Sequence, residues 1–264
     1  MKSYGAVAFF DILGYKAFLK HSQSDEVATL VVKTIANAED AVLSYFEKTS
    51  DGEEDAKEFM GHARAVTWVV FSDTLLLLCP FETSMSQLDV VRRWHVVILS
   101  AQILSKYMFE VGLPLRGCIS YGDFIHERNC FAGKTILEAY EFAESLQVAA
   151  TVIHPAAFDE LRSAVEPFAL QQDLTAKLIL MGSLIRYEVK MAFAVQQLHT
   201  INFLIVKGIT GVPSAWVGDC NEIVMRSFTQ HNKSLGEKEQ AKAENTTAYL
   251  RFLENKFPGS LSEA

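Results

Sequence analysis

Two aspartates that each end an apolar run are the residues of this chain best placed to do chemistry. Asp11 follows the run 6–10, and Asp73 closes the segment 69–72. A carboxylate at the end of a buried strand is costly to keep unless it is hydrogen-bonded or binds a cation. On adjacent strands, two such carboxylates would share a pair of metal ions. Residues 13–16, which follow Asp11, lead into a helical pattern, and the free backbone N–H groups at the start of that helix would lie beside the metal ions. Such N–H groups bind phosphate oxygens, so the segment favours a polyphosphate ligand and indicates nucleotide phosphoryl chemistry.

Other charged residues fit either a functional or a structural role, and Asp73 itself also fits an ordinary hairpin turn. Arg116 lies inside an apolar segment, where it is either a phosphate ligand or part of an ion pair with Asp123 or Glu138. Glu138 lies on a predicted helix, where it either approaches a substrate base or faces solvent. Lys134, at the start of that helix, either reaches a phosphate or faces water. The sequence leaves these alternatives open.

The composition limits the class of protein. With 264 residues, half of them apolar, the chain can bury a large core as one extended domain or as a domain with an appended lobe. The formal charge of −8 argues against a general nucleic-acid partner, because phosphate backbones are held by clustered Lys and Arg. No apolar run reaches about 18 residues, and the N-terminus reads as a strand rather than a signal peptide. We therefore expect a cytoplasmic protein with no membrane partner.

Cysteine and histidine patterns give no sign of a zinc site. The seven histidines show no zinc spacing, and a P-loop is absent because Gly133-Lys134-Thr135 lacks the upstream glycine. The four cysteines form no C-x-x-C pair, which predicts buried free thiols in a reducing compartment. These cysteines are Cys79, Cys118, Cys130 and Cys220.

The hydrophobic pattern predicts alternating strands and helices. In chain order we expect a strand at 4–12, a helix at 27–46, an acidic loop at 49–55, strands at 62–72 and 74–79, a helix at 84–111, a hairpin of 113–121 and 124–130 turned at Gly122-Asp123, a helix at 133–146 and a strand at 149–153. This order predicts an α+β fold of the ferredoxin-like kind, an antiparallel-rich sheet with helices on one face.

The pattern is weaker after residue 158. Strands are expected near 178–181, 185–190 and 201–206, followed by a polar helix at 238–256. We therefore expect residues 1–158 to form the catalytic core. Residues 159–264 would supply C-terminal strands and a helix that complete or extend the same domain.

Four sequence blocks, in this order, resemble the catalytic core of class III nucleotide cyclases. They are Phe-Phe-Asp-Ile-Leu-Gly-Tyr, Phe-Ser-Asp-Thr, Leu-Arg-Gly-Cys-Ile-Ser-Tyr-Gly-Asp and Phe-Ala-Gly-Lys-Thr-Ile-Leu-Glu-Ala-Tyr-Glu. The last block is closest to the bacterial pyrimidine cyclases of anti-phage defence, the Pycsar cyclases. The resemblance covers about Val7 to Pro155. It implies a ferredoxin-like cyclase domain that works as a head-to-tail homodimer, with active sites shared between the subunits.

The same resemblance implies a metal site. Asp11 and Asp73 fall on the two metal-binding aspartates of the family, and the carbonyl of Ile12 would complete one metal site. The expected cofactor is Mn²⁺ or Mg²⁺, with two ions in each active site. Such ions would lower the pKa of a ribose 3′-hydroxyl and neutralise a triphosphate.

The resemblance also assigns substrate contacts, with two departures. Arg116 falls on an arginine that contacts the polyphosphate, and Leu13 and Gly14 fall on the turn whose backbone amides cradle it. Many class III cyclases carry an Asn and an Arg, four residues apart, that stabilise the transition state and orient the ribose. Those places hold Leu137 and Glu141 here. The identity of the replacing cation is left open.

The residues expected near the base favour a pyrimidine. Purine cyclases commonly carry a base-reading Lys where this chain has Val69, next to Trp68. A bulky apolar wall there favours a smaller ring, and no carboxylate is placed to accept the 4-amino group of CTP. We expect conversion of UTP to 3′,5′-cyclic UMP as a second messenger. The alternatives are a cytidylate cyclase, a purine cyclase and a non-catalytic nucleotide-binding module; a diguanylate cyclase is disfavoured because its Gly-Gly-Asp/Glu-Glu-Phe signature is missing.

Overall fold

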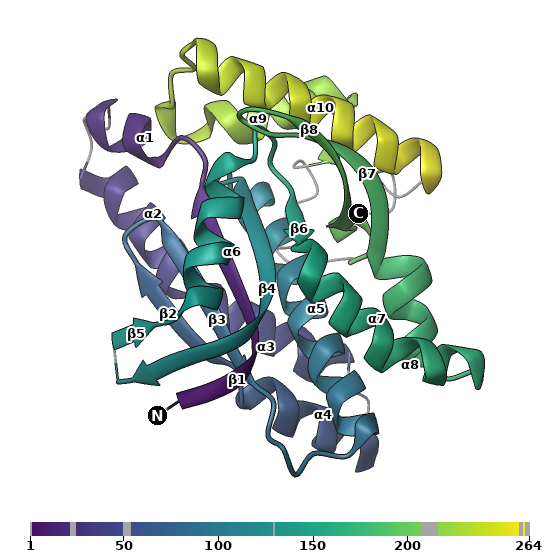
Figure 1. Ribbon diagram of the computed structural model, residues 1–264. Coiled ribbons are helices and arrows are strands. Elements are labelled where there is room, and N and C mark those ends of the chain that lie inside the picture. Colours follow the sequence, from purple (N-terminus) through teal and green to yellow (C-terminus); the bar gives the residue numbers. More distant parts are fainter. Residues whose placement is uncertain are drawn as a thin grey trace.

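One mixed sheet organises the chain (Figure 1). The computed structural model describes residues 2–21, 25–49, 54–128, 130–206, 216–258 and 261. Within them the strand order is β2-β3-β1-β4-β6-β8-β7, with β5 paired to β4. Neighbouring strands are antiparallel except β4 and β6, which are parallel. The strands are β1 (Lys2–Ile12), β2 (Thr67–Phe71), β3 (Thr74–Pro80), β4 (Leu115–Glu127), β5 (Cys130–Ala132), β6 (Thr151–Ile153), β7 (Leu184–Lys190) and β8 (Val195–Ile201).

Helices connect these strands and follow them. The longest, α5, begins with a capping box in which Ser86 and Asp89 satisfy each other's backbone N–H groups. The helices are α1 (Tyr15–His21), α2 (Asp25–Ala36), α3 (Ala38–Thr49), α4 (Glu54–Arg64), α5 (Gln87–Glu110), α6 (Lys134–Ser145), α7 (Pro155–Leu170), α8 (Leu174–Leu178), α9 (Cys220–Thr229) and α10 (Glu237–Lys256).

Both faces of the sheet are buried. Alternate residues of β1 enter two separate apolar clusters: Ala8 and Phe10 join the cluster formed with α3, α5 and α7, while Val7 and Phe9 join the cluster formed with α6, α9 and α10. A strand covered on both faces reads as a continuous apolar run, as β1 does. The predicted α+β class is confirmed. The prediction that helices cover one face is corrected, because α6, α9 and α10 cover the second face.

The predicted hairpin at Gly122-Asp123 is wrong. β4 runs without a break from Leu115 to Glu127 because it pairs with the whole of β1, and Gly122 lies opposite Gly5 in that register. A Cβ on Gly5 would lie only 2.1 Å from the carbonyl oxygen of Cys79 on β3, so this position needs glycine. The turn into β5 comes instead at Arg128, where φ is 55°.

Three other elements differ from the sequence prediction. The expected helix at 27–46 is divided into α2 and α3, and the expected strand at 62–72 begins only after α4. Residues 178–181 fall at the end of α8 and in a π-helical turn instead of a strand. Much of the acidic loop at 49–55 lies outside the described residues.

The C-terminal region continues the sheet. β8 pairs with β6 through Val152–Thr200 and Ile153–His199, and β7 then pairs with β8. β8 ends where the strand at 201–206 was expected to begin, whereas the polar helix at 238–256 matches α10 closely. We propose that residues 159–264 complete the same domain as residues 1–158.

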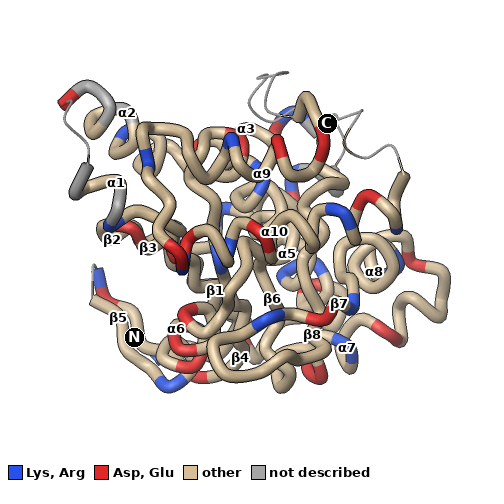
Figure 2. The backbone as a smooth tube through the Cα atoms, turned by 90° about the horizontal axis from the view of Figure 1, so that it is seen from above, with Lys and Arg blue, Asp and Glu red and all other residues tan. Residues whose placement is uncertain are grey.

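The surface and the thiols fit the composition. Figure 2 shows acidic and basic positions interspersed in this view of the backbone rather than gathered by sign. Cys79, Cys118 and Cys220 are buried free thiols, as predicted, whereas Cys130 is free but exposed on β5. In the described part of the chain, we find no helix that combines the length and the apolarity needed to cross a membrane.

Candidate active site

A cavity of about 360 Å³ lies where β1 ends, between the turn before β3 and the helices α6 and α10. Its walls come from segments far apart in the sequence. They are the end of β1 with the following turn (Phe9, Asp11 to Lys16), the start of β3 (Asp73, Thr74), Arg116 on β4, Tyr140 and Glu144 on α6, and Glu239 and Lys242 on α10.

Strand pairing brings the two predicted aspartates together. In the sheet register Asp11 lies opposite Thr74 on β3 and opposite Arg116 on β4. The Ile12 amide donates a hydrogen bond to the carbonyl oxygen of Asp73 at 3.0 Å, which fixes the β2–β3 turn against the end of β1. Both carboxylates therefore belong to one cavity.

The electrostatics of Asp11 suit a cation. Burial raises the pKa of its carboxyl above the usual range, and the nearby charge of Asp73 raises it further. The Arg116 guanidinium acts in the opposite direction through its charge and a hydrogen bond, without reversing the shift. Two carboxylates that repel each other in a half-buried cavity are stabilised by a divalent cation with oxygen ligands. The residues present thus fit a divalent-cation cofactor.

Arg116 is held in place on three sides. Its Nε donates to Asp11 Oδ2 at 2.7 Å, and its Nη1 donates to the carbonyl oxygens of Glu144 and, at 3.4 Å, Leu146, at the end of α6. The partner of Arg116 is therefore Asp11, and not Asp123 or Glu138 as the sequence alternatives had it. A guanidinium in this position fixes the Asp11 carboxylate and ties β4 to α6.

Asp123 and Glu138 have other partners. Asp123 pairs with Lys2 at 3.0 Å, and Glu138 pairs with Lys134 at 3.2 Å within the first turns of α6. Neither Lys134 nor Glu138 lines the cavity, whose α6 residues, Tyr140 and Glu144, come from the second half of that helix. A role for these two in catalysis would require a second subunit.

The turn after β1 lies at the cavity but offers fewer amides than expected. The Leu13 amide donates to the carbonyl oxygen of Pro114 at 2.9 Å, so in this conformation it has no hydrogen to give to a phosphate. Gly14 has a φ of 80°, the left-handed region that favours glycine, and its carbonyl oxygen accepts the Phe18 amide of α1. The buried Lys233 lies directly behind Gly14.

Trp68 does not reach the cavity. It packs against the cluster on the α5 side of the sheet, whereas its neighbour Val69 packs against the cluster on the other side, where Phe9 lies. Successive residues of a strand point to opposite faces, so Trp68 and Val69 cannot form one wall. Neither residue lines the cavity.

Several cavity residues were not predicted from the sequence. Tyr140 packs edge-on against Phe9 with ring centroids 5.3 Å apart, and Glu239 and Lys242 come from α10, more than 220 positions after Asp11. A polar helix with no motif gives no local sign of its partner. Only the packing of α10 onto the sheet reveals these contacts.

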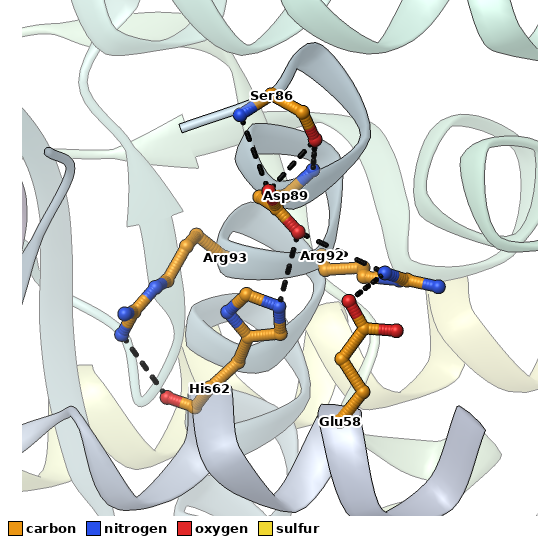
Figure 3. A network of polar contacts seen from close by, with 6 residues as sticks. All are labelled: Glu58, His62, Ser86, Asp89, Arg92 and Arg93. Carbon is orange, nitrogen blue, oxygen red and sulfur yellow. Dashed lines mark hydrogen bonds and ion pairs between the residues drawn. The ribbon is translucent and has the colours of Figure 1, made fainter. Parts of the chain in front are cut away.

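A second cluster of possible metal ligands lies elsewhere, between α4 and the start of α5 (Figure 3). Ligand atoms of Glu58, His62 and Asp89 lie within 4.8 Å of one another. Arg92 already pairs with both carboxylates of this cluster, at 2.5 Å from Glu58 and 3.7 Å from Asp89. Asp89 is further engaged by Ser86 in the capping box. We interpret this cluster as a polar network that joins the two helices.

Comparison with known proteins gives structural likeness only. No family model matches the sequence, and no curated protein matches it. Among solved structures, the adenylyl cyclase CyaB from P. aeruginosa shares 13% identity, covers 76% of this chain and 95% of its own, and gives a TM-score of 0.44. The guanylyl cyclase Cya2 shares 13% identity, and the match covers 76% of this chain and 91% of the Cya2 chain with a TM-score of 0.37. With both TM-scores below 0.5, we base no conclusion about activity on these likenesses.

Proposed function

We propose that this chain is a divalent-metal-dependent nucleotide cyclase that converts UTP to 3′,5′-cyclic UMP and pyrophosphate. The observation that carries the proposal is the meeting of Asp11 and Asp73 in one cavity that also holds Arg116 and Lys242. Paired carboxylates beside cationic side chains suit a metal-bound polyphosphate. A second messenger of this kind would serve anti-phage signalling, in line with the sequence resemblance to Pycsar cyclases.

The metal ligands of the proposed enzyme are Asp11 and Asp73, with the Ile12 carbonyl as a third donor. Bound ions would lower the pKa of the ribose 3′-hydroxyl and neutralise the triphosphate. The protein's own contribution is positional. Arg116 keeps the Asp11 carboxylate aimed at the cavity, and the hydrogen bond from Ile12 to Asp73 keeps the second carboxylate beside the first.

The proposed reaction needs no covalent enzyme intermediate. The ribose 3′ oxygen forms a bond to the α-phosphorus, and the bond from that phosphorus to the α,β-bridging oxygen breaks. The hydroxyl proton passes to water, and pyrophosphate leaves. Positioning and charge stabilisation supply most of the catalysis in such displacements, so a nucleophilic side chain is not required.

Product analysis with all four nucleoside triphosphates tests the proposed function. With Mn²⁺ present, we expect mass spectrometry to detect cyclic UMP as the main product, and pyrophosphate in equal amount. Cyclic CMP as the main product would favour a cytidylate cyclase, and cyclic AMP or GMP a purine cyclase. Nucleotide binding without any cyclic product would contradict the proposal and favour a non-catalytic module.

We also propose a homodimer with shared active sites. The cavity of one subunit contains no Asn and Arg pair from α6, whose equivalent positions are Leu137 and Glu141. On α6, Leu137 and Tyr140 leave 52% and 40% of their surface exposed. A partner subunit seated there would bring further groups to the substrate.

Mixed dimers test the sharing of sites. A chain with Asp73→Ala, mixed with a chain altered at Glu138 and Glu141, is expected to regain one working site in each heterodimer, up to half the wild-type rate. The measurement is cyclic nucleotide production after subunit exchange verified by native mass spectrometry. No recovery after verified exchange would count against shared sites.

A further inference from the structure

We infer that Lys242, on the C-terminal helix α10, binds the phosphate groups of the substrate in the cavity that holds Asp11 and Asp73. The inference rests on the proposed function and names a residue that the sequence resemblance does not reach. It also assigns a role to the C-terminal region in the chemistry, beyond completing the fold.

The first observation is position. Lys242 lines the same cavity as Asp11, Asp73 and Arg116, although it lies more than 120 residues from the nearest of them in the sequence. Its side chain is partly buried, and its charge is felt by the Asp11 carboxyl. An ammonium in the wall of this cavity is placed to meet an anion that enters with the metal ions.

The second observation is the anchoring of α10. Asn245 donates its side-chain amide to the carbonyl oxygen of Gln147 at 2.8 Å, and the Thr246 hydroxyl oxygen accepts the amide of Ala149 at 2.8 Å. Both contacts lie within about one turn of Lys242, and they fix this turn of α10 against the segment that follows α6. The lysine backbone is therefore held at the cavity by the fold, which reduces the entropy lost when a ligand binds.

The third observation is charge. Arg116 lies on the sheet side of the cavity. Its guanidinium already donates to Asp11 and to the carbonyl oxygens at the end of α6. Within the part of the chain that the structure describes, Lys242 forms no ion pair within 4.0 Å. Burial lowers the pKa of Lys242, and so do the like charge of Arg116 and, least of all, that of Lys238. Glu239 and Asp11 raise this pKa without reversing the shift. A polyphosphate that binds beside a partly desolvated ammonium and a second cation stabilises the charged form of the ammonium.

The structural alternative is a helix-surface pair between Lys242 and Glu239, three residues earlier on α10. Both residues line the cavity, yet no ion pair within 4.0 Å joins them in the described chain. Lys16, on α1, is the remaining cation of the cavity and is exposed to solvent. Among the described residues that line the cavity, Lys242 is thus the cation that combines partial burial, an anchored backbone and freedom from an ion pair.

The test compares Lys242→Met with Lys238→Met, a matched removal of an exposed lysine one turn earlier on the same helix. Isothermal titration with inorganic triphosphate and Mg²⁺ is expected to show binding weakened about 10-fold or more for Lys242→Met, the size typical of a lost charge-assisted hydrogen bond. Lys238→Met is expected to stay within about 2-fold of the wild type. Lys242→Arg should keep most of the affinity. Equal binding by the two Met variants would overturn the inference.

Further readouts separate this inference from the proposed function. In UTP turnover, we expect Lys242→Met to raise KM more than it lowers kcat, and melting curves should show both Met variants folded. If Lys242→Met does not fold, Lys242→Gln replaces it in the same comparison. If the wild type cyclises UTP and the Lys242→Met variant binds triphosphate as tightly as the wild type, only this inference is refuted. Wild-type protein that binds triphosphate through Lys242 but makes no cyclic product refutes the proposed function alone.

Discussion

Asp11→Asn and Asp73→Asn are each expected to lower kcat for UTP cyclisation by about 100-fold or more, while the fold is retained. Each change removes one of the two carboxylates that meet in the cavity, and the amide that replaces it is a poor ligand for Mg²⁺ or Mn²⁺. Mutations of residues that only hydrogen-bond to a metal ligand already lower metal affinity or activity by about 10–100-fold. The measurement is the initial rate of cyclic nucleotide formation at saturating metal.

Without divalent cations, the same Asp11→Asn variant should be at least as stable as the wild type at neutral pH. Burial raises the pKa of Asp11 above its ordinary value of 3.8, so the folded protein holds this proton more tightly than the unfolded chain does. The group therefore lowers stability as the pH rises from below 3.8 through the raised folded pKa, and the loss is complete above that pKa. Melting temperatures of the two proteins should converge as the pH falls through this window.

Asp123→Asn is the matched control for these changes. This carboxylate is exposed, pairs with Lys2 and lies outside the cavity, so its removal should leave the turnover rate within about 2-fold of the wild type. Near-normal rates in Asp11→Asn or Asp73→Asn, with intact protein, would contradict the two-carboxylate site. A large fall in Asp123→Asn as well would show that the assay reports folding rather than catalysis.

The sequence was informative where function depends on neighbouring residues. Asp11 and the turn after it form one continuous segment, and Asp73 lies in a hairpin with its own apolar flanks. Such local patterns predict both carboxylates, and antiparallel pairing of β1 with β3 and β4 then brings them to Arg116. The partner of Arg116 could not be predicted, because it depends on which residues of two distant strands lie opposite each other.

The errors have equally specific causes. Gly122-Asp123 carries the composition of a turn, but the long pairing with β1 overrides that local preference and keeps β4 extended. Trp68 and Val69 were expected to form one wall, although strand alternation sends them to opposite faces. Lys242 was missed because α10 is polar along most of its length and reaches the cavity only through tertiary packing.

A fragment that ends at Phe158 is expected to be unfolded or aggregated, although it contains every residue predicted for catalysis from the sequence. The apolar cluster that covers Val7 and Phe9 of β1 also contains side chains supplied only by later residues. Fully burying one such side chain contributes about 1.5–3 kcal/mol, so losing six of them removes as much free energy as most domains possess. These six are Ile223, Val224, Phe228, Tyr249, Leu250 and Leu253.

The fragment would also leave β6 without its partner β8, which exposes a strand edge prone to aggregation. A chain that ends at Pro258 is the control, because it keeps α10 and all six side chains. We expect this control to melt cooperatively, like the full chain, and the shorter fragment to show no cooperative transition in circular dichroism or calorimetry. Cooperative melting of the 1–158 fragment would instead show an independent core, with the C-terminal strands and helices as a separate addition. Since Lys242 reaches the cavity only when α10 is packed on the sheet, a folded 1–158 fragment that still bound triphosphate tightly would also argue against its role.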